Sequence, residues 1–353
     1  MEKIFIDPNN IDYSLIKKTA DFLRQGKLAA FPTETVYGIG CRADKRDAVS
    51  RLYAVKKRPQ DKPFAIALSQ AQNSIDNYFL TLTPFGHRLI EKFWPGPLTI
   101  IYYTPKNQKI GIRVPSHIVA NEILKELNLA VYLPSANISG EKEAVSALEV
   151  EKVFDGKVDL LVDSGVNAHS QPSTIVDLTY NPFKIVREGV ISEKEVVSSF
   201  VRKRILFICD NGSFCSPIAR FLLEKYLSME RVHFDIRYEI ISRGISVSER
   251  TGTDERMVSI LKEKEDLDLS GSLAKALSKL DVLSSDLIFT MNDSQSERIL
   301  KLEQTAEGRV FTLKKFLFSD SEQDIESMSE DLTSHETAYT LIRKAVLELK
   351  DWI

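Results

Sequence analysis

The sequence is poor in cysteine, has no long apolar run and carries little net charge, and each shortage excludes a class of protein. Three cysteines in 353 residues cannot form a disulfide framework. No apolar run approaches the roughly 18 residues that a membrane-spanning helix needs. The amino terminus carries Glu2, Asp7 and Asp12 and so does not resemble a signal peptide. We therefore expect a cytoplasmic protein without membrane contact.

The formal net charge of −3 divides into about +2 over the first 200 residues and about −5 over the rest. Overall attraction to nucleic acid is therefore weak, and RNA binding would need a local basic patch. Hydrophobic residues make up 43% of the chain and charged residues 27%, which is typical of a globular protein with buried cores. The length favours two domains.

Short apolar runs alternate with stretches of helical periodicity along the chain, which predicts an α/β fold. In the first half a helix begins near Tyr13 and ends at Gly26, and strands are expected at 28–31, 64–68, 98–103, 111–114, 130–133, 160–162, 174–178 and 184–186. The alternation restarts after a boundary at 192–203, so we expect domains over residues 1–200 and 201–353. In the second domain a doubly wound parallel sheet is predicted by strands at 205–208, 237–242, 287–290 and 310–313 and helices at 216–228, 251–264, 294–303 and 336–350.

Six polar clusters follow predicted elements of the first half, where open α/β sheets bind ligands. They occupy residues 32–40, 56–59, 109–115, 134–140, 172–177 and 186–189. The bunched cations of the second cluster suit a polyphosphate, because arginine offers a bidentate fork and lysine a point charge. Arg113 lies inside an apolar strand and needs a charged partner or a cleft. Taken singly, each cluster is at least as well explained by a solvated turn or a structural ion pair.

Together, in this order and spacing, the six clusters resemble the YrdC-like threonylcarbamoyl-AMP synthase family over residues 5–195. The segment Trp94-Pro95-Gly96-Pro97-Leu98-Thr99 resembles that family's sequence between the second and third clusters. The resemblance implies an open twisted α/β sheet around a deep, positively lined cavity. It also implies a nucleotidyltransferase that converts L-threonine, bicarbonate and ATP to threonylcarbamoyl-AMP and pyrophosphate, the first step of tRNA threonylcarbamoyladenosine modification.

The resemblance also implies residue roles. Threonine would be held by Thr33, Arg113, Ser135 and Ser173, and ATP by Lys56, Arg58, Asn137 and Arg187. Lys56 and Arg58, with a magnesium ion that accompanies ATP, would be the catalytic groups that stabilise developing charge, and no metal site of the protein's own is expected. Ala67 departs from the family, in which many members carry a histidine that lines the threonine site.

Other partners and two alternative functions stay open. The resemblance implies contact with tRNA or double-stranded RNA and with the proteins that transfer the threonylcarbamoyl group. The first half could instead be an RNA- or nucleotide-binding module without turnover, although such a module has no need of a threonine pocket. The chain could also be bifunctional, with an active protein phosphatase in its second half.

The second half begins with a strand, a tight loop and a helix start that resemble the phosphate loop of low-molecular-weight protein tyrosine phosphatases. Cys209 matches that family's nucleophile, and Ser216 matches the end of the loop. The arginine that would grip phosphate is replaced by Cys215, which offers one weak donor and no charge. In place of the family's Asp-Pro general acid the sequence offers only Asp324 or Asp331. We therefore predict a degenerate domain with little or no phosphatase activity. Cys209 and Cys215 could form a redox pair, although two retained small residues are the simpler interpretation.

Overall fold

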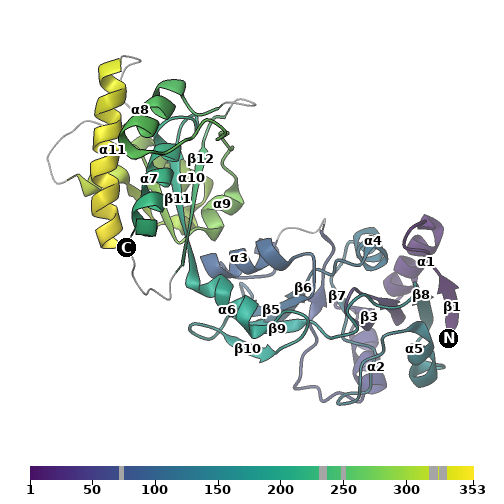
Figure 1. Ribbon diagram of the computed structural model, residues 1–353. Helices are drawn as coiled ribbons and strands as arrows, with labels where there is room; N and C mark the ends of the chain where they lie inside the picture. Colours follow the sequence, from purple (N-terminus) through teal and green to yellow (C-terminus); the bar gives the residue numbers. More distant parts are fainter. Residues whose placement is uncertain (71–74, 230–236, 248–251, 318–324, 326–331) are drawn as a thin grey trace. The chain divides into compact units, whose positions relative to one another are not determined.

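Two compact units make up the protein in the computed structural model, which describes residues 1–70, 75–229, 237–247, 252–317, 325 and 332–353 (Figure 1). The first unit comprises Met1–Leu82 and Arg88–Val197, and the second comprises Thr83–His87 and Ser198–Ile353. Each unit packs helices against a sheet, as the predicted α/β class requires. None of the helices formed by the described residues is both long and apolar enough to cross a membrane.

A mixed sheet forms the frame of the first unit. Within the described residues it has ten strands in the spatial order β1-β8-β2-β3-β7-β4-β6-β5-β9-β10. Strands β1, β8 and β2 run parallel, whereas β3 is antiparallel to both of its neighbours. The strands are β1 (Glu2–Phe5), β2 (Ala29–Pro32), β3 (Tyr37–Arg42), β4 (Ile66–Ala67), β5 (Leu98–Tyr103), β6 (Lys109–Arg113), β7 (Val131–Tyr132), β8 (Leu160–Asp163), β9 (Thr174–Asp177) and β10 (Lys184–Arg187).

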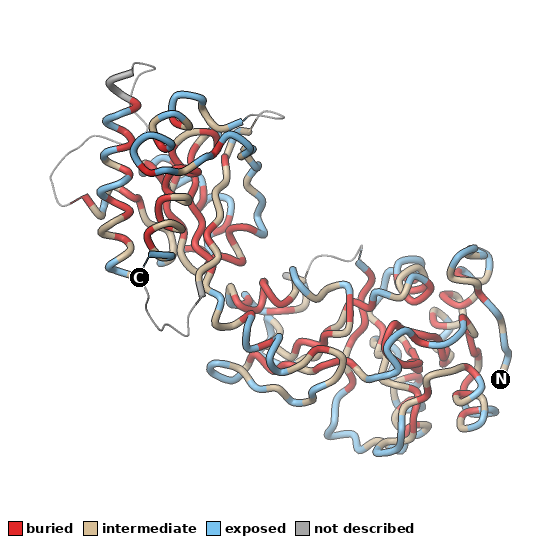
Figure 2. The backbone as a smooth tube through the Cα atoms, in the orientation of Figure 1, coloured by how far each residue is buried: buried red, intermediate tan, exposed pale blue. Residues whose placement is uncertain are grey.

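Helices cover both faces of this sheet. They are α1 (Tyr13–Arg24), α2 (Arg46–Lys56), α3 (Pro84–Phe93), α4 (Ile118–Leu127), α5 (Ala147–Phe154) and α6 (Glu193–Val201). Successive side chains of a strand point to opposite faces, so Ala29 and Phe31 pack with α1 and α4, whereas Leu28 and Ala30 pack with α2 and α5. The buried segments of Figure 2 follow these strands and the inner sides of the helices.

Strand β3 was not predicted, because its glycines interrupt the apolar alternation and the segment was interpreted as part of a polar loop. In the structure, Tyr37, Ile39 and Cys41 are buried on one face of the strand. A Cβ added at Gly38 would lie 2.7 Å from Leu133, and one at Gly40 would lie 2.8 Å from Phe31. The glycines are therefore required by close packing and not by a turn. Strand β1 was also missed, because its residues are mostly exposed.

A parallel sheet in the order β12-β11-β13-β14 forms the frame of the second unit, as predicted for a doubly wound fold. Phe207 and Phe289 pack on the side of α7 and α11, and Leu206 and Ile288 pack on the side of α9 and α10. The elements are β11 (Arg202–Cys209), α7 (Cys215–Met229), β12 (Arg237–Gly244), α8 (Glu255–Glu265), α9 (Lys279–Ser284), β13 (Leu287–Thr290), α10 (Asp293–Leu302), β14 (Val310–Thr312) and α11 (Leu332–Trp352). Strand β11 begins earlier than the apolar run at 205–208 predicts, because it pairs with β12 from Arg202 onward.

Candidate active site

A cavity of about 440 Å³ lies in the first unit where several strand ends and loops converge. Each of the six polar clusters contributes to its wall. The sequence-predicted residues on the wall are Thr33, Arg58, Arg113, Ser135, Ser173 and Arg187. The cavity therefore brings together all four predicted threonine-binding side chains and two of the four predicted ATP-binding side chains, from segments far apart in the sequence.

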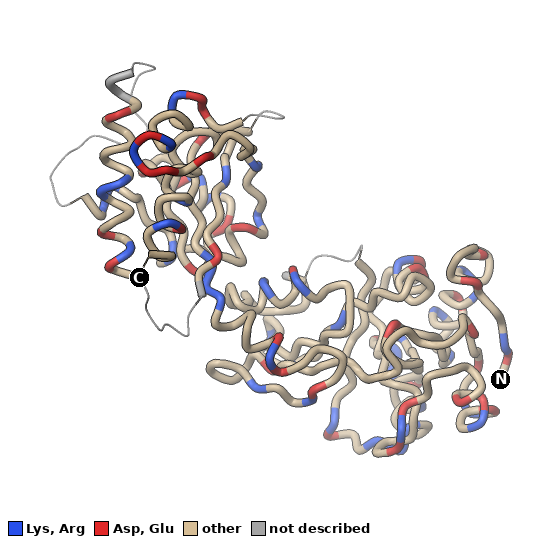
Figure 3. The backbone as a smooth tube through the Cα atoms, viewed as in Figure 1, with Lys and Arg blue, Asp and Glu red and all other residues tan. Residues whose placement is uncertain are grey.

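Cations outnumber carboxylates on the wall of the cavity. The cations are Arg58, Lys62, Lys109, Arg113 and Arg187, and the carboxylates are Asp61 and Asp177. Basic and acidic residues are interspersed along the backbone of the unit (Figure 3), so this excess arises from folding and not from a basic stretch. Burial lowers the pKa of Arg187, and the positive charges of Arg113 and Arg58 lower it further against the opposing effect of Glu143. Guanidinium groups that repel one another in this way favour an anionic ligand.

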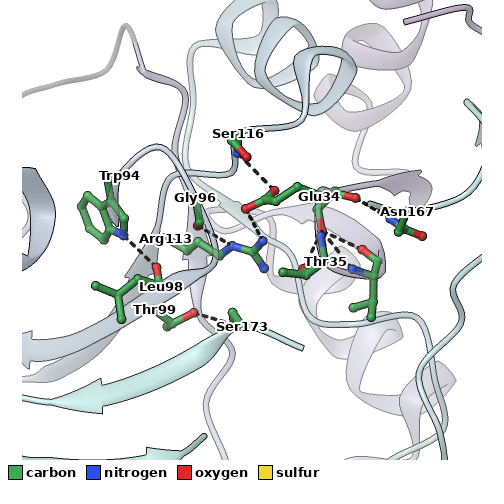
Figure 4. A network of polar contacts seen from close by, with 12 residues as sticks. Glu34, Thr35, Trp94, Gly96, Leu98, Thr99, Arg113, Ser116, Asn167 and Ser173 are labelled. Carbon is green, nitrogen blue, oxygen red and sulfur yellow. Dashed lines mark hydrogen bonds and ion pairs between the residues drawn. The ribbon is translucent and has the colours of Figure 1, made fainter. Parts of the chain in front are cut away.

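Arg113 stands at the end of β6 and has both the charged partner and the cleft that its apolar surroundings demand. Its Nη2 donates to Glu34 Oε1 at 2.7 Å and its Nε donates to the Gly96 carbonyl at 3.2 Å (Figure 4). Glu34 is only 5% exposed, and its Oε2 accepts the Ser116 amide at 3.1 Å. No hydrogen bond ties Arg113 Nη1 to any residue in the described part of the chain. That nitrogen is available to a ligand in the cavity.

The turn that follows β2 contributes the Thr33 hydroxyl to the same cavity wall as this arginine. Thr33 Oγ1 donates to the Val36 carbonyl at 2.7 Å and lies 2.9 Å from Thr35 Oγ1. Asn167 Nδ2 donates to the Thr33 carbonyl, and the His169 amide donates to the Glu34 carbonyl at 3.0 Å. The turn that follows β2 is therefore held by its own side chains and by a loop more than a hundred residues away.

Ser173 and Arg187 form a second group on the wall. Ser173 Oγ lies 3.0 Å from Thr99 Oγ1 (Figure 4) and accepts Arg187 Nη2 at 3.2 Å. The Ser173 carbonyl also accepts Arg187 Nε and Nη2, at 3.0 and 2.9 Å. A Cβ at Gly189 would lie 2.1 Å from the Pro172 carbonyl oxygen, so only glycine permits this approach of the two segments.

Arg58 lies at the cavity after helix α2, and its guanidinium is oriented by its surroundings. Its Nε donates to the Lys62 carbonyl at 2.8 Å and its Nη2 to the Pro63 carbonyl at 3.2 Å. The guanidinium also lies over the Phe64 ring at 5.2 Å from the centroid. These contacts leave hydrogen-bonding capacity for a phosphate, since a guanidinium has five N–H donors.

Lys56 and Asn137, which the resemblance assigns to ATP binding, are hydrogen-bonded to a loop beside the cavity. Among the residues that the structure describes, the cavity wall includes neither. Lys56 is 2% exposed, and its ammonium donates to the Ser135 carbonyl, to the Asn137 carbonyl at 2.8 Å and to Asn137 Oδ1 at 3.2 Å. Asn137 Nδ2 donates to the carbonyls of Ile138 and Glu141. Both side chains therefore fix the loop that presents Ser135 to the cavity.

Glu34, Thr99 and Asn167 are site residues that the sequence reasoning did not single out. Glu34 lies within the first polar cluster and Thr99 within the segment 94–99, and the need of Arg113 for a charged partner was the signal that could have pointed to Glu34. Asn167 carried no local signal, because its partner Thr33 is 134 positions away. Ala67 also lines the cavity, as a small residue where a histidine is common in the resembled family.

Cys41 is fully buried in the core beside the site, and burial raises the pKa of its thiol to about 12. The described residues contain no group of three or more His, Cys, Asp or Glu side chains that could hold a metal ion.

The predicted phosphate loop of the second unit is internally hydrogen-bonded. Cys209 Sγ accepts the Gly212 amide at 3.2 Å and lies 3.0 Å from Ser216 Oγ. Asn211 Oδ1 accepts the Ser213 amide at 3.1 Å. Cys215 is fully buried and belongs to the hydrophobic core, so it does not take the place of a phosphate-gripping arginine. The candidate acids Asp324 and Asp331 lie outside the described residues.

The fold and the cavity define a class of protein: a mixed-sheet α/β protein with a cavity lined by cations and hydroxyl groups. Comparison with known proteins agrees with this class. A family model described as "Telomere recombination", for Sua5, YciO and YrdC, matches residues 21–189. A model described as "Low molecular weight phosphotyrosine protein phosphatase" matches residues 204–350.

Named relatives place the first unit in a family. A threonylcarbamoyl-AMP synthase of Pyrococcus abyssi is 34% identical over 192 residues, which are 51% of this chain and 56% of that protein. A putative threonylcarbamoyl-AMP synthase of Methanocaldococcus jannaschii is 34% identical over 187 residues, which are 50% of this chain and 87% of that protein. The chain belongs to the Sua5/YciO/YrdC family. It spans about half the length of the Pyrococcus abyssi and Bacillus subtilis synthases that it matches.

Solved structures support the fold. Pyrococcus abyssi Sua5, solved in complex with L-threonine, is 22% identical with a TM-score of 0.54, and the match covers 88% of this chain and 99% of that chain. Escherichia coli YciO is 25% identical with a TM-score of 0.51, and the match covers 56% of this chain and all of that chain.

Proposed function

We propose that the first unit makes threonylcarbamoyl-AMP and pyrophosphate from L-threonine, bicarbonate and ATP. The observation that carries the proposal is the convergence of three arginines and three hydroxyl side chains, one from each polar cluster, on a single cavity. Relatives named threonylcarbamoyl-AMP synthase, and a protein of the same fold solved with L-threonine, support it.

Threonine suits the hydroxyl-rich part of the cavity wall. Its carboxylate is a partner for Arg113 Nη1, the nitrogen that the ion pair with Glu34 leaves available. The ammonium and hydroxyl groups of threonine suit the oxygens of Thr33, Ser135 and Ser173, which also line the cavity. These contacts would hold the amine in one orientation for reaction.

ATP suits the cationic part of the wall. Arg58 and Arg187 offer guanidinium donors, and Lys62 adds an exposed ammonium. In this proposal Lys56 and Asn137 assist the nucleotide through the loop that they hold, since their polar atoms already have partners within it. A magnesium ion bound with ATP would neutralise phosphate charge.

The chemistry needs positioning and charge stabilisation and no covalent intermediate with the protein. The threonine ammonium loses a proton to solvent, the resulting amine attacks the carbon of bicarbonate, and water leaves, which gives a carbamate. A carbamate oxygen then attacks the α-phosphorus of ATP. The bond from that phosphorus to the bridging oxygen breaks, and pyrophosphate leaves with the electron pair. The arginines on the wall would stabilise the negative charge that moves onto the leaving group.

The product is a reactive mixed anhydride, so an acceptor must consume it before water does. We propose that the acceptor is tRNA, served by threonylcarbamoyl-transferase proteins, which makes this reaction the first step of the tRNA modification. We propose that the second unit supports or regulates this chemistry without phosphatase activity of its own.

The direct test incubates the whole chain with ATP, L-threonine, bicarbonate and Mg²⁺ and measures pyrophosphate together with the adenylate by mass spectrometry. Pyrophosphate release should require both threonine and bicarbonate. Equal ATP turnover with either one omitted would overturn the proposal. An RNA- or nucleotide-binding module would bind ATP and release no pyrophosphate.

A further inference from the structure

We propose that Glu34 is a positioning residue that fixes the orientation of Arg113 and thereby sets the affinity for threonine. The inference rests on the proposed function and names a residue to which the sequence assigned no role. Glu34 is not on the cavity wall formed by the described residues, so it acts on a ligand through Arg113.

The Arg113 guanidinium is constrained at two of its three nitrogens. Nη2 donates to Glu34 at 2.7 Å and Nε donates to Gly96 at 3.2 Å. The Gly96 carbonyl is itself fixed, because the Gly96 amide donates to the Val114 carbonyl at 2.7 Å. Two fixed nitrogens define the plane of the guanidinium and the direction of the remaining N–H donors (Figure 4). A donor group held in this way does not have to be ordered when the ligand binds.

Glu34 also joins this arginine to two other parts of the site. Its second carboxylate oxygen accepts the Ser116 amide, just before helix α4. Its backbone follows Thr33 directly, so the Thr33 hydroxyl and the carboxylate that pairs with Arg113 come from consecutive residues of one turn. A change at Glu34 should therefore affect the ligand that these two side chains contact together.

Stability alone is a weak explanation for this buried ion pair. Removing two charges from water costs free energy that their attraction need not recover. Well-packed apolar residues of similar volume often stabilise a core equally well. The pair is better explained by orientation, because the arginine must remain charged and directed at an anionic ligand.

The experiment compares Glu34→Gln and Glu34→Asp with the wild-type full-length chain. Glutamine keeps the size of the side chain and one oxygen for the Ser116 amide but loses the charge. Aspartate keeps the charge but is one methylene too short to reach Arg113 and Ser116 together. The measurements are kcat, the KM for threonine and the KM for ATP from pyrophosphate release, with the melting temperature.

Asp159→Asn is the matched control, because Asp159 also pairs with one arginine and one backbone amide. Its oxygens accept Arg51 at 2.6 and 2.9 Å and the Leu28 amide at 2.7 Å. Among the described residues, neither Asp159 nor these partners line the cavity. Asp159→Asn should leave both KM values unchanged.

We expect Glu34→Gln to raise the KM for threonine by about tenfold or more, with the KM for ATP within about threefold of wild type. Glu34→Asp should lie between wild type and glutamine. If Glu34→Gln fails to fold, the aspartate variant decides by the same comparison. An unchanged KM for threonine, or equal increases for both substrates, would overturn the inference. Wild-type protein that releases no threonine-dependent pyrophosphate would instead overturn the proposed function, so the two failures are distinguishable.

Discussion

Replacing Lys56 with methionine separates two ways in which this lysine could serve ATP. The ammonium donates to the Ser135 carbonyl and to two oxygens of Asn137, within a loop whose Ser135 lines the cavity. If Lys56 acts by holding this loop, its loss should disturb the sites for both substrates. If it contacts phosphate directly, only ATP should be affected.

The expected change in stability can be worked from the same contacts. Burial, together with the positive charge of Arg58, lowers the pKa of Lys56 from 10.5 to about 8 against the opposing effect of Glu143. A depression of this size corresponds to roughly 3 kcal/mol of penalty on the ammonium at neutral pH. Methionine removes that penalty but leaves three buried oxygens without this donor, each worth about 1–3 kcal/mol. The two effects oppose, so the free energy of unfolding at pH 7 should change by no more than a few kcal/mol.

The lowered pKa of Lys56 also predicts how the free energy of unfolding changes with pH. Between about pH 8 and 10.5 the unfolded chain still binds the proton that folded Lys56 has lost, so stability rises with pH. Wild type should therefore gain free energy of unfolding relative to Lys56→Met as pH rises through this range, as measured by urea denaturation at several pH values. A difference that does not vary with pH would refute the burial argument.

The kinetic assay is pyrophosphate release with each substrate varied in turn. Lys56→Met should raise the KM for threonine and the KM for ATP by about tenfold or more each. The comparison variant Arg58→Gln should raise the KM for ATP by a similar factor and leave threonine near wild type. An increase confined to ATP in Lys56→Met would show direct phosphate contact and refute the role assigned to the loop.

Two other predictions concern the division of the chain. A fragment of residues 1–200 should fold and retain threonine-dependent pyrophosphate release, because the whole cavity wall comes from the first unit. An inactive fragment beside an active full-length chain would show that the second unit completes the site. The wild-type chain should hydrolyse aryl phosphates and phosphoarginine poorly, because cysteine brings no positive charge to a phosphate. Robust wild-type turnover that Cys209→Ser abolishes would contradict the degenerate interpretation.

Much of the fold followed from local patterns. The helix from Tyr13 to Arg24 has an aspartate cap at Asp12, whose carboxylate accepts the Ser14 amide at 2.9 Å, and a glycine at φ +79° just beyond its end. Both signals are visible in the sequence. Strand β3 was missed because Gly38 and Gly40 serve contacts with Leu133 and Phe31, which no local pattern contains.

The candidate site also contains residues that the sequence could single out and residues whose placement depends on contacts between distant segments. Arg113 could be singled out because a charge inside an apolar strand demands an explanation, and the structure supplies Glu34 as its partner. Lys56 was harder to place, because a buried ammonium in a loop and an ammonium on a phosphate have the same sequence signature. Only the carbonyl oxygens of Ser135 and Asn137, some eighty positions away, distinguish the two.

The phosphatase-like loop shows how a binding motif can keep its shape without its charge. Two of its amides donate inside the loop, that of Gly212 to Cys209 Sγ and that of Ser213 to the side chain of Asn211. Asp210 is held from outside the loop, because Arg298 donates to its carboxylate at 2.7 Å and Gln295 donates at 3.0 Å. With Cys215 packed into the core, these contacts stabilise the loop without a bound anion. A loop stabilised in this way can persist as part of a structural unit, because its conformation does not depend on the phosphate that an arginine would have attracted.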